Sequence, residues 1–462
     1  MKRGIVSLMA VATVLTGSYA ASAETLKEAL AAAYSSNPQL MAQRAALRAT
    51  DEGVSQAKSG FLPNLSGTWS YNKSDGTTSP VGQDSFDTAT DNKGYSVTAQ
   101  QNFFNGFQDR NNVLRAKSNV RAGRAQLQSV EQQVLQEAVA AYMNVVRDQA
   151  VVELNENNVQ VLERQLQASQ DRFRVGEVTR TDVAQSEARL ENAKSQLLSA
   201  EATRAASRAQ YQRVIGHAPT ALETPLAKPV LPTNLDEAIE TAMELSPNVV
   251  IARHNEKAAK YQLNSAKGAL LPTVGAQVQY SDNSGSSFDN NSGQFLNSSR
   301  TNLSYGIQVS VPLYAGGQRH SQIRQAKQVR SQRLLEIRQA ERVAQEGVFV
   351  AWDQYRAATG QIRSTQASVR ANEIALEGVR QEAYVGSRTT LDVLNAEQEL
   401  LNSRVSYVRA QRDEFVAAYN LVSATGKLTA RDLALGVNVY DEERYYDKVG
   451  GSKFIGFDTK VD

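Results

Sequence analysis

The chain contains no cysteine and only three histidines among its 462 residues. Without cysteine it can form neither a disulfide nor a thiolate metal site. The histidines, at positions 217, 254 and 320, lie far apart and lack the spacing of metal ligands. The sequence also has no G-x-S-x-G, P-loop or G-x-G-x-x-G motif, so we expect no metal, no cofactor and no enzymatic activity. A hydrolase built from distant carboxylates is the remaining enzymatic alternative, and no motif of paired acids marks one.

Long apolar runs are scarce as well. Lys2 and Arg3 precede the apolar stretch "GIVSLMAVATVL", and "ASA" at residues 21–23 is a small-residue cleavage pattern. This pattern predicts a secretory signal peptide over residues 1–23, with the mature chain beginning near Glu24. Beyond it no stretch of about 18 apolar residues occurs, so no transmembrane helix is expected. If the exported chain enters a membrane, it must do so as a closed β-barrel, which also satisfies backbone amides in lipid.

A large net charge of either sign is also absent. The chain has 50 basic and 48 acidic residues, and Lys2 and Arg3 of the leader account for the difference. A mature chain that is neutral overall is poorly suited to bind nucleic acid or to lie on an anionic membrane surface through a basic patch. We therefore expect no nucleic-acid partner.

What the sequence does contain is an internal repeat. The stretch "VGEVTRTDVAQSEARL" begins at Val175 and "VGSRTTLDVLNAEQEL" begins at Val385, and seven of their sixteen positions are identical. Likewise "TLKEALAAAYSSNPQL" at Thr25 resembles "NLDEAIETAMELSPNV" at Asn234. One register held over nearly the whole chain indicates a duplication. We predict a first repeat at residues 24–228, a second at 229–430, a proline-rich linker at 218–234 between them, and a polar tail at 431–462.

Each repeat is predicted to contain two β-strands, at about 62–72 and 94–104 and at about 272–282 and 302–314. Stretches such as "LSGTWSY" and "NLSYGIQVSVPLY" alternate apolar and polar residues, which is the period of a strand. Aromatic residues lie near the strand ends, where membrane barrels keep aromatic girdles. The polar segments 72–93 and 281–301 are expected to be exposed loops. Four strands cannot close a barrel, so two chains with eight strands or three with twelve must combine.

Each strand pair is followed by a long helical pattern. Residues 105–172 contain no proline, and small apolar residues recur there at near-heptad spacing, as they do in the second repeat. Turns are predicted near Gly176 and Gly386, with return helices ending near Gly216 and Gly426. A return helix and the helix before the strands, placed end to end, together have the length of one long helix. The predicted fold class is therefore an α+β membrane protein, internally duplicated, in which a strand barrel continues into a helical tube.

These features resemble the TolC-like outer-membrane efflux proteins, most specifically through "YVGSRTTLDVLNAEQELLNSR" from Tyr384. The resemblance implies a homotrimer with a twelve-stranded barrel in the outer membrane of a Gram-negative bacterium, four strands from each chain, continuous with a periplasmic α-helical coiled-coil barrel. It implies outer-membrane lipid around the barrel. It also implies docking to a periplasmic adaptor (membrane fusion) protein and to a proton-driven or ATP-driven inner-membrane pump. The expected function is passive export of drugs and toxic compounds or of secreted proteins, as in type I secretion.

The same resemblance places both repeated motifs at the periplasmic mouth. It implies a gate at Asp392, where the family has an aspartate ring, and Asn395 stands where the family has a second acidic ring. It implies that Arg388 ties the inner hairpin to the outer one at Thr181 and Asp182. The residues expected to form the turns and the adaptor docking surface are Val175, Gly176, Thr179, Val385, Gly386 and Thr389.

Two other interpretations stay open at this point. Thr179 to Asp182 and Thr389 to Asp392 both fit [ST]-x-x-[DE], the pattern of a capping box at a helix N-terminus. A periplasmic coiled-coil scaffold or adhesin without a pore is the alternative function. It predicts a protein that gives no conductance, and the four amphipathic strands count against it.

Overall fold

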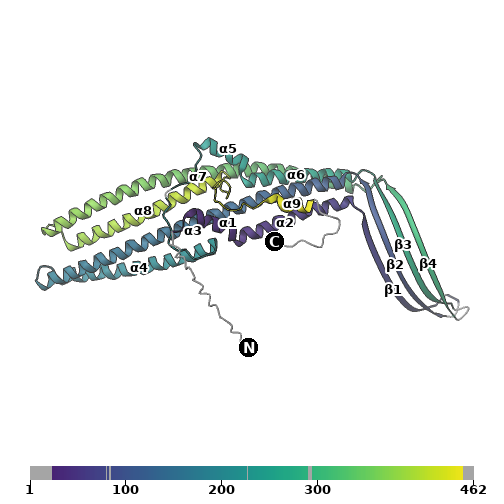
Figure 1. The fold of residues 1–462 in the computed structure, drawn as a ribbon, viewed down its shortest axis with the longest axis horizontal. Helices are drawn as coiled ribbons and strands as arrows, with labels where there is room; N and C mark the ends of the chain where they lie inside the picture. Colours follow the sequence, from purple (N-terminus) through teal and green to yellow (C-terminus); the bar gives the residue numbers. More distant parts are fainter. Residues whose placement is uncertain (1–22, 80, 83–84, 226, 290–293, 451–462) are drawn as a thin grey trace, which may run out of the picture.

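The molecule is elongated, with a helical body that carries a four-stranded sheet at one end (Figure 1). The structure is a computed structural model that describes residues 23–450 except 80, 83, 84, 226 and 290–293. Apart from Ala23, the predicted signal peptide lies outside the described residues, as do the last twelve residues of the predicted tail. Among the described residues, no helix is apolar over a length that could cross a membrane.

The order of elements repeats along the chain. The first repeat comprises α1 (Leu26–Ser36), α2 (Pro38–Lys58), the short 3-10 helix η1 (Ser59–Phe61), β1 (Asn64–Thr78), β2 (Phe86–Asn105), α3 (Gln108–Arg174) and α4 (Arg180–Ile215). The second comprises α5 (Leu235–Leu245), α6 (Pro247–Gly268), β3 (Thr273–Asp289), β4 (Gln294–Ser310), α7 (Gln318–Tyr384) and α8 (Thr390–Ala424). A last helix, α9 (Glu442–Gly450), follows in the tail.

The long helices α3 and α7 each run 67 residues from the sheet to a hairpin tip at the opposite end (Figure 1). α4 has 36 residues and returns beside α3, while α1 and α2, with 11 and 21 residues, cover the rest of it. Pro38 begins α2, because proline lacks the backbone N–H that continuing α1 would require. The stacking of two shorter segments beside one long helix agrees with the length argument from the sequence.

The sheet is antiparallel in the order β1-β2-β3-β4. Its register carries one row of side chains across all four strands, Leu65, Ala99, Val278 and Tyr305. A second such row consists of Gly67, Val97, Tyr280 and Leu303. Because side chains alternate between the two faces of a strand, these rows give the sheet a continuous apolar face. The polar residues between them, such as Ser66 and Thr98, lie on the other face.

All four strands are longer than the alternation predicted, because pairing continues into the segments expected to be loops. β1 and β2 stay paired as far as Thr78 and Phe86, and β3 and β4 as far as Asp289 and Gln294. Polar contacts follow the ladder there: the Thr77 hydroxyl donates to the Asp87 carboxylate at 3.0 Å. Backbone hydrogen bonds between strands need no apolar side chains. The point at which apolar and polar residues stop alternating is therefore not the point at which each strand ends.

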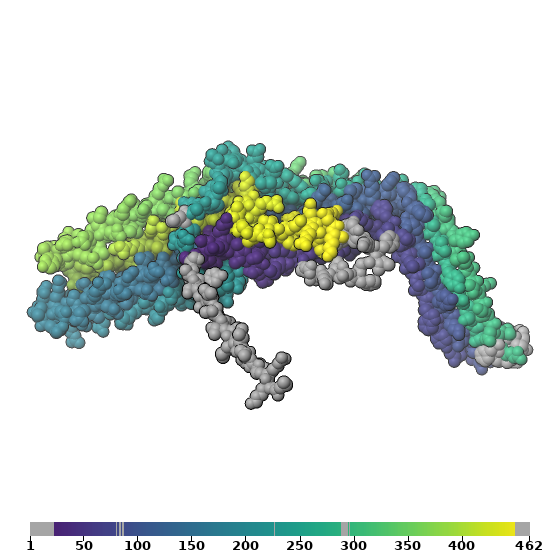
Figure 2. All heavy atoms as spheres, in the orientation of Figure 1, coloured from purple at the N-terminus to yellow at the C-terminus, as the bar shows by residue number. Residues whose placement is uncertain are grey.

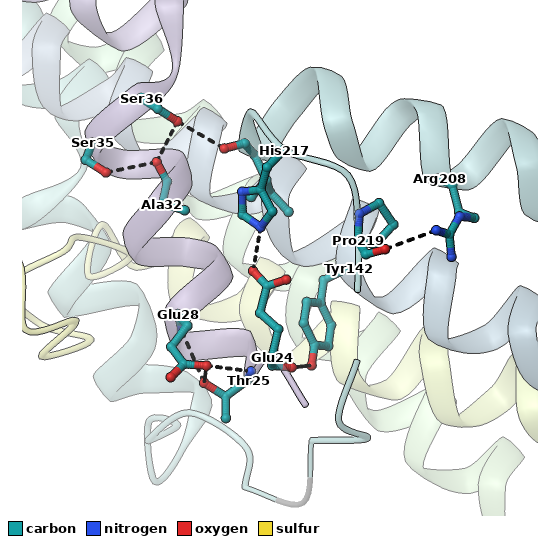
Figure 3. Close-up of polar contacts among 11 residues, drawn as sticks. Glu24, Thr25, Glu28, Ala32, Ser35, Ser36, Tyr142, Arg208, His217 and Pro219 are labelled. Carbon is teal, nitrogen blue, oxygen red and sulfur yellow. Dashed lines mark hydrogen bonds and ion pairs between the residues drawn. The ribbon is translucent and has the colours of Figure 1, made fainter. Parts of the chain in front are cut away.

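The main hydrophobic core lies midway along the helical body. It joins α1, the middle of α3, the ends of α4 and α8, and the chain just after α8. Figure 3 shows a cluster of polar contacts beside this core, where the Tyr142 hydroxyl donates to the Glu24 carbonyl oxygen at 2.7 Å. The same hydroxyl lies 2.6 Å from the Glu223 carbonyl oxygen, and the Glu24 carboxylate lies 3.0 Å from His217 Nε2. The beginning of the mature chain, the end of α4 and the linker are therefore held together at one level.

The tail lies along the first repeat rather than projecting into solvent. Figure 2 shows it in yellow along the helical body, and α9 lies beside α2 on the side toward the sheet. Its beginning is not polar, because Leu435 is buried in the main core and Leu433, Val437 and Tyr440 pack against that core. The sequence prediction of a polar extension therefore applies to the later residues of the tail alone.

Candidate gate at the hairpin tips

Two turns of the same geometry form the tips, one after α3 and one after α7. Gly176 and Gly386 adopt positive φ angles of 77° and 81°, a conformation that glycine takes without steric cost. The Glu177 N–H donates to the Arg172 carbonyl and the Ser387 N–H donates to the Glu382 carbonyl, both at 2.9 Å. These bonds close the C-termini of both long helices in the same way.

Each return helix begins with a capping box, which confirms the capping interpretation of the repeated motif. The Thr179 side chain accepts from the Asp182 N–H at 3.3 Å, and the Asp182 carboxylate accepts from the Thr179 N–H at 2.9 Å. Thr389 and Asp392 repeat these contacts at 3.2 and 2.9 Å. The threonine and aspartate matched in both copies therefore have a structural reason to be there.

Asp392 is partly exposed, and its carboxyl group carries a lowered pKa. The chief cause is the Thr389 backbone N–H, followed by the Thr389 hydroxyl, and Arg388 makes a smaller contribution. Because this pKa is lowered in the fold, the capping bond stabilises the helix above the ordinary carboxyl pKa and is lost as pH falls through the lowered value. At neutral pH the side chain is a fixed negative charge at the tip.

Arg388 makes its contact within its own hairpin. Its Nε donates to the Glu382 carboxylate at 2.8 Å, and both side chains are about half exposed. Asp182, on the other hairpin, is engaged by Thr179. Within one chain the structure therefore does not bring Arg388 to Thr181 or Asp182, and the tie that the resemblance implies stays a prediction.

The two hairpins of the chain meet through Asn395, which the sequence had pointed to as a gate position, and through Arg189 and Leu394, which it had not. Arg189 on α4 donates to the Asn395 side-chain oxygen on α8 at 2.7 Å. Beside Asn395, the Leu394 side chain is 2% exposed and packs into an apolar cluster with Val159, Leu162, Leu190 and Ala193. We call this contact, from Leu394, Asn395 and Arg189, the hairpin junction. A comparison of the two repeats could have found this contact. The first repeat has the small residue Ala184 at the position where the second has the large apolar Leu394.

A family model described as "Outer membrane efflux protein" matches residues 29–217 and 238–427, one segment in each repeat. The chain is 37% identical to the outer membrane efflux protein BepC of Brucella suis over 447 residues, which is 97% of this chain and 94% of BepC. It is 26% identical to the outer membrane protein TolC of Vibrio cholerae, over 89% of this chain and 92% of TolC.

The fold is shared with solved channel structures. The crystal structure of the outer membrane protein VceC from Vibrio cholerae superposes with a TM-score of 0.70 at 20% identity, covering 87% of this chain and 96% of VceC. The chain therefore belongs to the outer membrane efflux protein family, as an outer-membrane export channel protein whose four strands contribute to a β-barrel and whose duplicated helices form a large periplasmic part.

Proposed function

We propose that three copies of this chain form one duct through which solutes pass passively from the periplasm to the outside. The observation that carries the proposal is the unequal burial of two equivalent helices. Within the chain, α3 contributes 22 buried residues while α7, of the same length, contributes four: Val348, Ala351, Thr365 and Leu376. α3 is covered by α2 on one side and by α6 of the second repeat on another. α7 is the equivalent of α3 in the second repeat and is covered by α6 on one side. Its other side would be covered by α2 of a neighbouring chain, as that of α3 is covered by α6.

The sheet supports the same assembly. β1 and β4 are its two edge strands, and each pairs on one side within the chain. An unpaired edge in lipid leaves backbone amides without partners, so the edges of neighbouring chains would pair. Three chains give twelve strands, enough to leave an open interior, whereas eight strands are filled by their own side chains. The apolar rows on the sheet would then face outer-membrane lipid.

The cargo is proposed to be drugs and other toxic compounds, or secreted proteins, delivered by an inner-membrane pump through a periplasmic adaptor. The tips offer a docking surface for the adaptor, because Val175 and Val385 are 77% and 75% exposed. Two large apolar side chains at the matched position of both turns are costly to leave in water, and an interface would cover them. Gly176, Thr179, Gly386 and Thr389 shape the turns that present them.

The gate is proposed to lie at Asp392, where carboxylates of three chains would converge. Negative charges in a narrow passage favour cations and oppose anions. Asn395, where the family has its second acid, is neutral and is engaged by Arg189, so it would add contact between hairpins rather than charge. The alternative of a scaffold or adhesin without a pore predicts no conductance from the folded protein.

Substituting Asp392 with asparagine is expected to lower the preference for potassium over chloride by roughly severalfold, because three carboxylates leave the passage. The measurement is the reversal potential of the purified protein in a planar bilayer under a potassium chloride gradient. Asp182→Asn is the matched control, because Asp182 makes the same capping contacts in the first copy. Equal shifts in the two variants would contradict a gate at Asp392, and a folded wild type without conductance would favour the scaffold.

A further inference from the structure

The last part of the tail, residues 437–450, forms a strap across the first repeat (Figures 1 and 2). Upstream of it, the Gly426 carbonyl after α8 accepts from Gln132 Nε2 on α3 at 2.6 Å. The strap then makes a polar contact with each helix that it crosses. The Tyr440 N–H donates to the Tyr34 hydroxyl on α1 at 3.0 Å. Arg124 on α3 donates to Glu443 at 2.7 Å, and the Tyr445 hydroxyl donates to Glu52 on α2 at 2.7 Å. It therefore connects the end of the second hairpin to α1, α3 and α2 of the first repeat.

A carboxyl group is buried beneath this strap without a partner. Asp51 on α2 is 2% exposed, and neither of its carboxylate oxygens has a hydrogen-bond partner among the described residues. The matching position on α6 is Lys260, which is exposed and has no strap over it. A buried carboxylate without hydrogen bonds is costly, whereas a protonated carboxyl is tolerated far better. The burial of Asp51 is thus a feature of the strapped repeat alone.

The charged groups around Asp51 do not remove this cost. α2 presents Arg44, Arg48 and Glu52, α3 presents Arg124, and the strap presents Tyr440, Glu442 and Tyr445. Burial raises the pKa of Asp51 to about 6, Arg124 opposes the rise, and the negative charges of Glu52 and Glu442 add to it. Burial also raises the pKa of Glu442, against Arg124 and Arg431. Two acids on opposite sides of the contact therefore both favour their protonated forms.

We propose that the strap is a pH-dependent closure, held tightly on α2 and α3 when Asp51 is protonated and loosened when Asp51 is charged. The folded-state pKa is raised, so the contribution of Asp51 to docking is fully present below its ordinary value of 3.8 and is lost as pH rises through about 6. With an ordinary pKa in the open state, the equilibrium constant for strap opening rises about tenfold between about pH 5 and about pH 7.5. Mild acid therefore tightens the link between the second hairpin and the first repeat.

The test is amide hydrogen exchange of residues 440–448 in the purified full-length protein across that pH range, corrected for the intrinsic exchange rate. The wild type is expected to show the roughly tenfold increase in opening. Asp51→Asn, the neutral isostere of the protonated side chain, is expected to reduce the pH dependence to the part that Glu442 contributes, and to keep the strap as protected as it is in the wild type in acid. An Asp51→Asn profile that still follows the wild type would overturn the proposal.

Two further variants separate this effect from a general loss of charge or of folding. Asp447→Asn removes an exposed acid from α9, the helix of the strap, and is expected to keep the full pH dependence. Glu442→Gln removes a negative charge that disfavours charged Asp51 and is expected to reduce the pH dependence without abolishing it. If Asp447→Asn flattens the profile as much as Asp51→Asn does, the dependence arises from net charge and the proposal fails.

Discussion

Alanine at Gly268 is expected to destabilise the folded chain by about 3 kcal/mol, at the upper end of the cost of overpacking. Gly268 ends α6 where it crosses the junction between β2 and α3. An added Cβ would lie inside van der Waals contact with the Gly106 carbonyl oxygen and 3.1 Å from Gln108 Cγ. Gly106 adopts a φ of 68°, so its backbone is already held in a conformation that few residues adopt. A carbonyl group cannot rotate away as a side chain can, which makes relief of the clash expensive.

The measurement is unfolding of the purified protein in detergent, followed by the helical circular dichroism signal. Gly53→Ala is the control, because a Cβ there meets nothing within 4 Å in the chain and alanine is the better helix former. The matching residue in the first repeat is Ser59, so the repeat itself tolerates a side chain at this position. Equal stability of the two alanine variants would show that the close approach of Gly268 to Gly106 is not needed.

Alanine at Leu394 is expected to loosen the hairpin junction and to raise single-channel conductance severalfold. Truncating a buried leucine costs about 2–5 kcal/mol, and here the lost contacts are those between α8 and the pair α3 and α4. The hydrogen bond from Arg189 to Asn395 would remain, but a bond between exposed side chains contributes about 1 kcal/mol or less. The two hairpins would then separate more often, and the periplasmic mouth would widen.

Leu391→Ala is the control for this conductance experiment, because Leu391 lies one turn away on α8 and is 38% exposed. It changes the same side chain at the same tip without emptying the cluster. Conductance that rises equally in both variants would point to general disorder of the tip. Conductance that rises in neither would place the closure of the mouth away from the hairpin junction.

The repeat and its periodicities predicted most of the architecture. Small apolar residues at near-heptad spacing predicted α3 and α7, and the glycines at 176 and 386 predicted their turns. Alternation predicted all four strands but not their ends, because the outer parts of β1 and β2 pair through polar residues such as Thr77 and Asp87. Local patterns therefore identified the elements, whereas strand length depended on pairing with a distant partner.

The contacts at the tip were harder to predict, because they depend on how the helices cross. The capping boxes are local and followed directly from the spacing of threonine and aspartate. Arg388 instead pairs with Glu382, an acid on its own hairpin. The sequence pattern did not indicate that Glu382 would compete with Asp182 for this arginine. The pairing of Arg189 with Asn395 joins residues about 200 positions apart, and neither residue type is unusual on a helix. The contacts of the strap with α1, α2 and α3 were not predicted for a similar reason, since the strap has no counterpart in the other repeat.

The most direct test of the account is to cross-link the hairpin junction and measure conductance. The chain has no cysteine, so cysteines placed at 189 and 395 in the Leu394→Ala background can be joined selectively by a short bismaleimide. A matched sample is treated with a monofunctional maleimide. If the junction sets the aperture of the periplasmic mouth, the cross-linked channels return to the low wild-type conductance while the matched sample stays high. Equally high conductance in both samples would contradict a periplasmic gate at these tips that the hairpin junction holds closed.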